Sequence, residues 1–256
     1  MTRPAAQLTG FTVDIATRRG RRSPVVRALH DVDLTVHPGS VTALIGESGC
    51  GKSLVAAALC GLLPPGSRTE GRLVIDGDDF SGADERQWRS VRGSHIGLVP
   101  QSAATSFTPV HTIGAQLNQV CRQLNSDRSA AELLTAAHLA VETGSLYPHE
   151  ISGGMAQRAA IAAAMAGRPE LLVADEPTSA LDPGHAAAVW ELLAEVAGTG
   201  TGVLVITHDL DSLMESQVCR EIALMREGSV ICQEPAVAMT DSTDGYVRSF
   251  FTGALS

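Results

Sequence analysis

The feature that most constrains the fold is the segment from Gly46 to Ser53, which reads Gly-Glu-Ser-Gly-Cys-Gly-Lys-Ser. This G-x-x-x-x-G-K-S spacing is typical of a phosphate-binding loop, whose glycines let backbone N–H groups surround a phosphate chain. Lys52 can reach the terminal phosphates, and the Ser53 hydroxyl can bind Mg²⁺. The residues expected to contact nucleotide here are Gly46, Glu47, Ser48, Gly49, Cys50, Gly51, Lys52 and Ser53.

The segments on either side of the loop support this interpretation. Residues 40–45 are apolar enough for a short buried strand, and residues 54–59 are typical of a helix. A strand, a glycine-rich loop and a helix in this order place the positive end of the helix dipole at the phosphates. The sequence therefore predicts a nucleoside triphosphate site.

Strand and helix patterns alternate through the rest of the chain, which predicts an α/β fold with a mostly parallel sheet. A helical block over about 112–166 interrupts this alternation, and we interpret it as an inserted subdomain. Short strands are expected within 7–45, at 73–78, 94–101, 171–174 and 203–207, and in a hairpin around Gly228, with an amphipathic helix at 185–197.

Charge and cysteine content limit the classes of partner and the cellular compartment that we expect. The 256 residues carry a net charge of −9, which argues against a nucleic-acid partner, because non-specific binding to nucleic acid needs a basic surface. The basic cluster at 18–22 is expected to be a solvated loop; the alternative is contact with nucleotide or an acidic partner. The five cysteines form no paired motif, which fits a reducing cytosol.

A second element of the site follows the apolar strand at 171–174. Asp175 and Glu176 end that strand, where a carboxylate near the phosphate loop can hold Mg²⁺. Asp175 is assigned this role, and Glu176 is then placed to act as general base toward the attacking water.

A glycine pair opens a helix further upstream. Ser152 can cap this helix or bind phosphate, and Gly153 and Gly154 can offer backbone N–H groups. From the local chemistry alone, an ordinary capped helix remains the alternative.

Taken in order, these motifs resemble the ATP-binding-cassette (ABC) ATPases over about residues 8–235. Gln101 matches the family's Q-loop glutamine, residues 151–155 its signature sequence, residues 179–182 its D-loop, and His208 its switch histidine. The resemblance implies a P-loop NTPase (RecA-like) core with an antiparallel β subdomain and an inserted α-helical subdomain. It implies one nucleotide-binding domain over 1–256, with its core at about 1–101 and 167–240, the helical subdomain at about 102–166, and a tail at 241–256.

The same resemblance implies a shared active site. Two such domains would bind two ATP molecules head to tail, with Lys52, Gln101, Glu176 and His208 as catalytic residues. Mg²⁺ would be held by Ser53, Gln101 and Asp175. Residues that would complete the nucleotide sites of the dimer are Ser152, Gly153, Gly154 and Asp182.

One feature departs from the family pattern. The family usually stacks adenine on an aromatic residue near the start of the domain, but the equivalent residues 14–19 contain none, and Phe11 is displaced. Stacking by Ile15 or an arginine is the alternative. This departure implies weaker nucleotide affinity or base selectivity.

Finer features resemble the oligopeptide/dipeptide/nickel importer subfamily. The segments 101–114 and 147–155 resemble its Q-loop and signature runs, and Met155 resembles the first of its two ATPases. The implied partners are a second, different ATPase, two transmembrane permease subunits and, indirectly, a solute-binding protein, with the chain at the cytoplasmic face of the inner membrane. The C-terminal segment 244–248 matches only in part, and its shortness resembles nickel or metallophore members. The alternatives are an exporter ATPase and a soluble ABC ATPase in repair or ribosome function.

Overall fold

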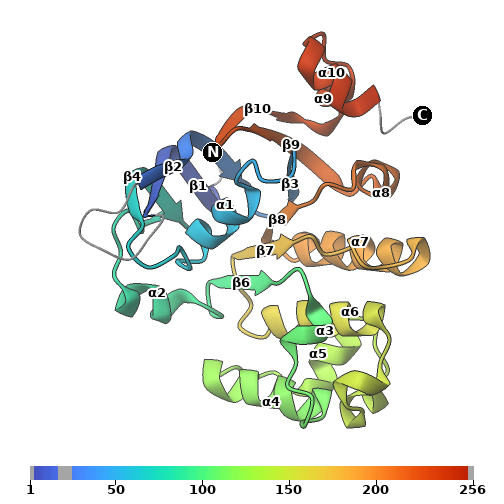
Figure 1. Ribbon diagram of the computed structural model, residues 1–256. Coiled ribbons are helices and arrows are strands. Elements are labelled where there is room, and N and C mark those ends of the chain that lie inside the picture. Colours follow the sequence, from blue (N-terminus) through green and yellow to red (C-terminus); the bar gives the residue numbers. More distant parts are fainter. Residues whose placement is uncertain (1–2, 17–24, 253–256) are drawn as a thin grey trace.

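The computed structural model describes residues 3–16 and 25–252 and contains two β-sheets (Figure 1). The smaller sheet is antiparallel, has four strands and lies at the N-terminal side of the molecule. Its strands, in spatial order, are β2 (Val25–Val36), β1 (Ala6–Ala16), β4 (Arg68–Ile75) and β5 (Asp78–Asp79). The basic cluster at 18–22 lies outside the described residues.

The larger sheet has six strands and carries the phosphate loop. Its first five strands in chain order are parallel, as the alternating pattern predicts, and the last one pairs antiparallel with the fifth to form the expected hairpin at one edge. In spatial order they are β10 (Ser229–Pro235), β9 (Cys219–Arg226), β3 (Val41–Gly46), β8 (Gly202–Ile206), β7 (Leu171–Asp175) and β6 (Ile96–Val99).

The two faces of this sheet belong to two different cores, because successive side chains of a strand point to opposite faces. Leu44 and Ile206 face the core that contains α1 (Lys52–Leu59) and the inner side of the antiparallel sheet. Ala43 and Val205 face the opposite core, together with α7 (Pro183–Gly198) and α8 (Leu210–Ser216). Helix α1 is therefore held between the two sheets, which fixes the loop that precedes it.

Helical structure fills the connection between β6 and β7, below the sheet in Figure 1. The predicted fold class, an α/β P-loop core with an antiparallel β subdomain and an inserted helical subdomain, is confirmed, while the predicted boundaries at 102 and 166 stay a prediction. The inserted elements are α3 (Ala103–Ser106), α4 (Ile113–Leu124), α5 (Ala130–Ala136), the 3₁₀ turns η1 (Val141–Ser145) and η2 (Pro148–Glu150), and α6 (Gly153–Ala164).

Three further helices lie at the periphery. They are α2 (Glu85–Val91), whose Trp88 ring packs at 4.9 Å from that of Phe80, and the C-terminal α9 (Ala236–Thr240) and α10 (Gly245–Thr252). Across the described ranges, no helix combines the length and apolar character that would carry it through a bilayer.

Candidate functional site

The phosphate loop connects the buried strand β3 to α1 and needs glycine at both of its ends. Gly46 has φ 153°, and a Cβ there would collide with the carbonyl oxygen of Met225. Gly51 has φ 112°, and a Cβ would lie 2.9 Å from side-chain atoms of Leu29 and of Met225. Helix α1, all of which is described, has no side-chain cap, so its first N–H groups remain for a ligand.

Lys52 is folded into the loop that it follows. Its Nζ donates to the carbonyl oxygens of Gly46 at 2.8 Å and Glu47 at 2.9 Å, and the residue is only 8% exposed. These donors of the ammonium group brace the loop, and Nζ also lies 4.0 Å from Cys50 Sγ. Cys50 turns its side chain into the core behind the loop and does not line the cleft.

Ser53 and Asp175 come together from adjacent elements of the fold. The Ser53 hydroxyl donates to Asp175 Oδ1 at 3.4 Å, at the carboxyl end of β7. Burial raises the pKa of the Asp175 carboxyl, and the Ser53 hydrogen bond opposes that shift. A hydroxyl and a carboxylate are the hard oxygen ligands that Mg²⁺ prefers, and a cation bound here would offset the cost of burying the Asp175 carboxylate. These residues therefore fit a magnesium ion.

Glu176 and His208 form a close pair beside this oxygen cluster. His208 Nδ1 lies 2.6 Å from Glu176 Oε1, and the His208 backbone N–H approaches Glu176 Oε2 at 3.4 Å. The Glu176 backbone has φ 49°, in the left-handed region, and its N–H donates to the Ile206 carbonyl at 2.8 Å. A glutamate in this strained conformation is held by its surroundings, as is common at functional sites.

Ser53, Glu176 and His208 share one cleft of about 710 Å³ with the phosphate loop, above the carboxyl ends of the parallel strands. That volume lies within the range of small-molecule sites. Asp175 is not among the residues that line this cleft, although it contacts Ser53. The residues that line it are Gly46, Glu47, Ser48, Gly49, Gly51, Lys52, Ser53, Leu54, Gln101, Glu176, His208 and Phe250. Most of the residues proposed for ATP thus meet in one place.

Two lining residues were not predicted from the sequence: Leu54, which directly follows the phosphate loop, and the distant Phe250. Phe250 belongs to α10, in a segment that matched the subfamily only in part. The signal that was available is the spacing of Tyr246 and Phe250, four residues apart, which puts two aromatic rings on the same side of a helix.

The remaining predicted site residues gather at a different place, the N-termini of α6 and α7. Ser152 caps α6 by accepting from the Met155 N–H at 3.2 Å, and Asp182 caps α7 by accepting from the His185 N–H at 3.1 Å. A Cβ on Gly154 would collide with the His185 ring, so only glycine allows these two helix ends to meet. Ser152 and Gly153 are exposed there, which leaves them accessible to another molecule.

The N-terminal segment does not offer an aromatic surface to the cleft within the part described. Phe11 is 2% exposed and packs in the core, which agrees with its expected displacement. Asp14 is bound to the Arg27 guanidinium at 2.9 Å, and that hydrogen bond lowers the pKa of the Asp14 carboxyl. Residues 17–19 of the predicted adenine region lie outside the described residues.

Comparison with known proteins agrees with this arrangement. A family model described as "ABC transporter" matches residues 29–179. The chain is 37% identical over 241 residues to a probable peptide ABC transporter ATP-binding protein, y4tR, of Sinorhizobium fredii, with 90% of this chain and 71% of that protein covered. It is 39% identical over 217 residues to a probable D,D-dipeptide transport ATP-binding protein, DdpD, of Escherichia coli, with 80% and 66% covered. The chain thus spans about two thirds of the length of these curated relatives.

A solved structure shares the architecture. The ATP-binding cassette MJ0796, described as a dimer in a post-hydrolysis state bound to ADP and Pi, superposes with a TM-score of 0.75 at 27% identity. The match covers 90% of this chain and 98% of that one.

Proposed function

The chain belongs to the ABC transporter family, and from this premise we propose that it hydrolyses ATP to power import of a peptide-, nickel- or metal-chelate-class solute through separate membrane subunits. The observation that carries the proposal is the cleft in which the phosphate loop meets the Glu176–His208 pair at 2.6 Å. The names of the relatives favour peptide transport over soluble repair or ribosome functions. The name of a further relative, from Brucella melitensis, contains the words "peptide import" and favours import over export.

The residues of the cleft divide into those that bind the triphosphate and those that hold the metal. The loop N–H groups and Lys52 are suited to the phosphate oxygens, since they are donors in a fixed arrangement. Ser53, Asp175 and Gln101 would hold Mg²⁺, which when bound neutralises charge on the phosphates.

Glu176 is the general base of the proposed reaction. Its carboxylate would take a proton from the water that attacks the terminal phosphorus, as the bond between that phosphorus and the bridging oxygen of ADP breaks. His208 holds one carboxylate oxygen at 2.6 Å and would orient the carboxylate. Because the Glu176 side chain is 10% exposed while that of His208 is 63% exposed, the histidine is the partner that a bound nucleotide can reach.

Two cassettes are needed for a complete site. ABC ATPase subunits of import systems dimerise and work with membrane permeases. Ser152, Gly153, Gly154 and Asp182 lie apart from this chain's own cleft, at the ends of α6 and α7, which supports a role for them in the site of a second cassette. We infer from the Met155 form of the signature that this second cassette is a different ATPase chain.

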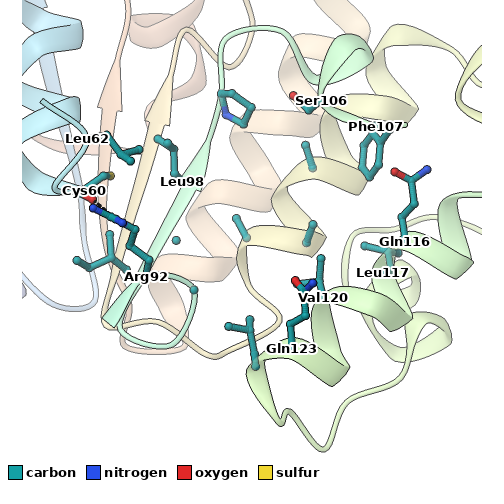
Figure 2. A pocket seen from close by; sticks show the side chains of 18 residues that line it. Cys60, Leu62, Arg92, Leu98, Ser106, Phe107, Gln116, Leu117, Val120 and Gln123 are labelled. Atoms are coloured by element: carbon teal, nitrogen blue, oxygen red, sulfur yellow. Dashed lines mark hydrogen bonds between the residues drawn. The ribbon is translucent and has the colours of Figure 1, made fainter. Parts of the chain in front are cut away.

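A second groove, which shares no lining residue with the nucleotide cleft, suits the membrane subunits, and its lining is drawn in Figure 2. It has a volume of about 360 Å³ and lies between β6, α4 and α6. Leu62 and Leu98 line it and are 50% and 36% exposed, and Phe107 lies at its far wall. Such an apolar groove with polar tips is suited to a short amphipathic helix, and this position would place the chain at the cytoplasmic face of the inner membrane.

The segment from Gln101 to Gln116 joins the two sites. Gln101 lines the nucleotide cleft, and Ser106, Phe107 and Gln116 line the groove. The Gln116 side chain closes this segment on itself, since it accepts from the Thr108 N–H at 2.8 Å and donates to the Thr108 carbonyl at 3.0 Å. This connection would carry the state of the nucleotide to the membrane subunits.

The proposal is tested by purifying the tagged chain from its host in mild detergent and identifying the proteins that accompany it. Two membrane subunits, a second ATPase and a solute-binding protein are the expected companions. Recovery with only soluble or ribosomal proteins would contradict transport and leave ATP hydrolysis to be measured separately.

A further inference from the structure

The C-terminal helix α10 lies against the phosphate loop. The Tyr246 hydroxyl donates to Glu47 Oε1 at 3.2 Å, and Glu47 is part of the loop. One helical turn later, Phe250 lines the nucleotide cleft. Tyr246 is 199 residues from Glu47 in sequence. A distant segment of the chain therefore contacts the loop that is proposed to bind the triphosphate.

The opposite side of α10 anchors it to the core. Val247 and Phe251 are 4% and 3% exposed and belong to the large apolar core. The Arg226 guanidinium lies 4.6 Å from the centre of the Tyr246 ring, a cation–π contact that also holds the tyrosine in place.

Two features would let helix α10 move as a unit once its contacts are released. Asp244 Oδ1 accepts from the Tyr246 and Val247 N–H groups at 2.9 and 3.0 Å, so the helix carries its own N-terminal cap. Residues 241–244, between α9 and α10, belong to no helix or strand, and they would act as the hinge of a moving α10.

Phe250 places an apolar ring in the cleft that is proposed to bind a charged phosphate chain. It lines the same cleft as Glu176 and His208, which in the proposed reaction would face the terminal phosphate of a bound nucleotide. A phosphate oxygen placed against a phenyl ring loses hydrogen bonds to water and gains none from the ring. In the proposed shared site, the signature segment of a second cassette would also have to approach this cleft, of which Phe250 forms part of the wall.

We propose that α10 is an autoinhibitory strap, held over the terminal-phosphate end of the cleft by the Tyr246–Glu47 hydrogen bond and by Phe250, and released when a nucleoside triphosphate binds. This inference rests on the proposed function. The cleft admits a nucleotide while the strap is in place, because Phe250 forms a wall of a space of about 710 Å³ and does not fill it. The strap therefore restrains closure of the dimer and not entry of the ligand.

Hydrogen exchange of the full chain tests the strap directly. The amides of α10 should exchange at least threefold faster with Mg²⁺ and a non-hydrolysable ATP analogue than with MgADP, because only the triphosphate reaches Phe250. Unchanged or slower exchange with the analogue would overturn the strap. Nucleotide binding is measured in the same samples by displacement of a fluorescent nucleotide, so a failure to bind would be recognised as a failure of the proposed function.

A conservative variant tests the latch itself. Tyr246→Phe removes the hydroxyl and keeps the ring on Arg226, so α10 should exchange faster without nucleotide by roughly fivefold, the change expected for one ordinary hydrogen bond. The other tyrosine provides the matched control, since Tyr147→Phe changes the same group on the helical subdomain. If Tyr246→Phe exchanges like the unmodified chain, Tyr246 is not a latch and the proposal is wrong.

Discussion

His208 Nδ1 lies 2.6 Å from Glu176 Oε1, and the backbone N–H of the same histidine lies 3.4 Å from the other carboxylate oxygen. One residue therefore contacts both oxygens of the proposed base. Because Glu176 has a left-handed backbone with φ 49°, its side chain can point from the end of β7 toward His208, two residues beyond the end of β8. The two strand ends together fix the direction of the carboxylate.

Glu176→Gln should bind MgATP and fail to turn it over. The amide keeps the shape of the side chain and a hydrogen-bonding oxygen, but it cannot accept a proton, and general-base catalysis contributes about 10²–10⁴-fold. Phosphate release and nucleotide binding, measured on the same preparation, check this. Glu191→Gln, on the exposed side of α7, is the matched control. Equal rates in Glu176→Gln and the unmodified chain would refute the base assignment.

His208→Ala should lower kcat by at least about tenfold and leave the affinity for MgATP within about twofold, because the histidine positions the base and the loop binds the phosphates. Steady-state kinetics separate the two effects. His95→Ala removes a histidine–glutamate pair of similar length, 3.0 Å to Glu170, at the start of β6 and away from the cleft. A matching loss of kcat in His95→Ala would mean that the effect is structural.

Asp175→Asn should make the nucleotide-free chain more stable at neutral pH. It should also abolish the dependence of the chain's thermal stability on Mg²⁺ in the presence of ATP. Burial raises the pKa of the Asp175 carboxyl in the folded chain. A raised folded pKa gives stability that is present below the unfolded pKa and is lost as pH rises through the folded value, so at neutral pH the charged group opposes folding. Thermal unfolding of both chains, with and without MgATP, measures this. The prediction fails if the variant has a lower Tm without nucleotide.

Gly46→Ala should destabilise the chain by about 2–4 kcal/mol, because the new Cβ collides with the Met225 carbonyl in a backbone conformation with φ 153° that L-residues rarely adopt. Gly198→Ala is the matched control, since its Cβ meets nothing within 4 Å at the end of α7, and it should stabilise the chain by about 0.5–1 kcal/mol. Urea unfolding measures both. If the two variants change the free energy of unfolding by similar amounts, the backbone near Gly46 can shift to avoid the collision without loss of stability, and the prediction is wrong.

The sequence was sufficient to predict the parts of this molecule that depend on local pattern. The strand–loop–helix around Lys52 and the strand that ends at Asp175 follow from apolar runs and glycine spacing, which act over a few residues. The position of Cys50 behind the loop was not predicted, because the motif fixes the loop's backbone and not the direction of a variable side chain. The approach of Phe250 to the cleft could not be predicted either, since it depends on how α10 packs on a distant surface.

The separation of Ser152 and Asp182 from the cleft illustrates another limit. Their role in a shared site was implied by resemblance, and their geometry shows two helix caps at one exposed edge. A single chain holds no information on what lies opposite that edge, so their function in a second cassette stays a prediction. Ser152→Ala would remove a cap and a phosphate ligand together, and for this reason it does not separate the two roles.

The apolar groove of Figure 2 leads to a prediction about assembly. Leu62→Asp places a charge on a side chain that is 50% exposed at the groove, so it should disturb folding little while opposing burial against a membrane subunit. We expect the tagged variant to lose its membrane companions in mild detergent, at least tenfold by quantitative mass spectrometry, and to keep the nucleotide affinity of the unmodified chain. Val237→Asp, on α9 and 75% exposed, introduces the same charge away from the groove and should retain those companions. Retention by both variants would show that the membrane subunits bind elsewhere, whereas loss by both would show that any added surface charge disrupts the complex. Only loss in Leu62→Asp alone assigns the groove to the membrane subunits.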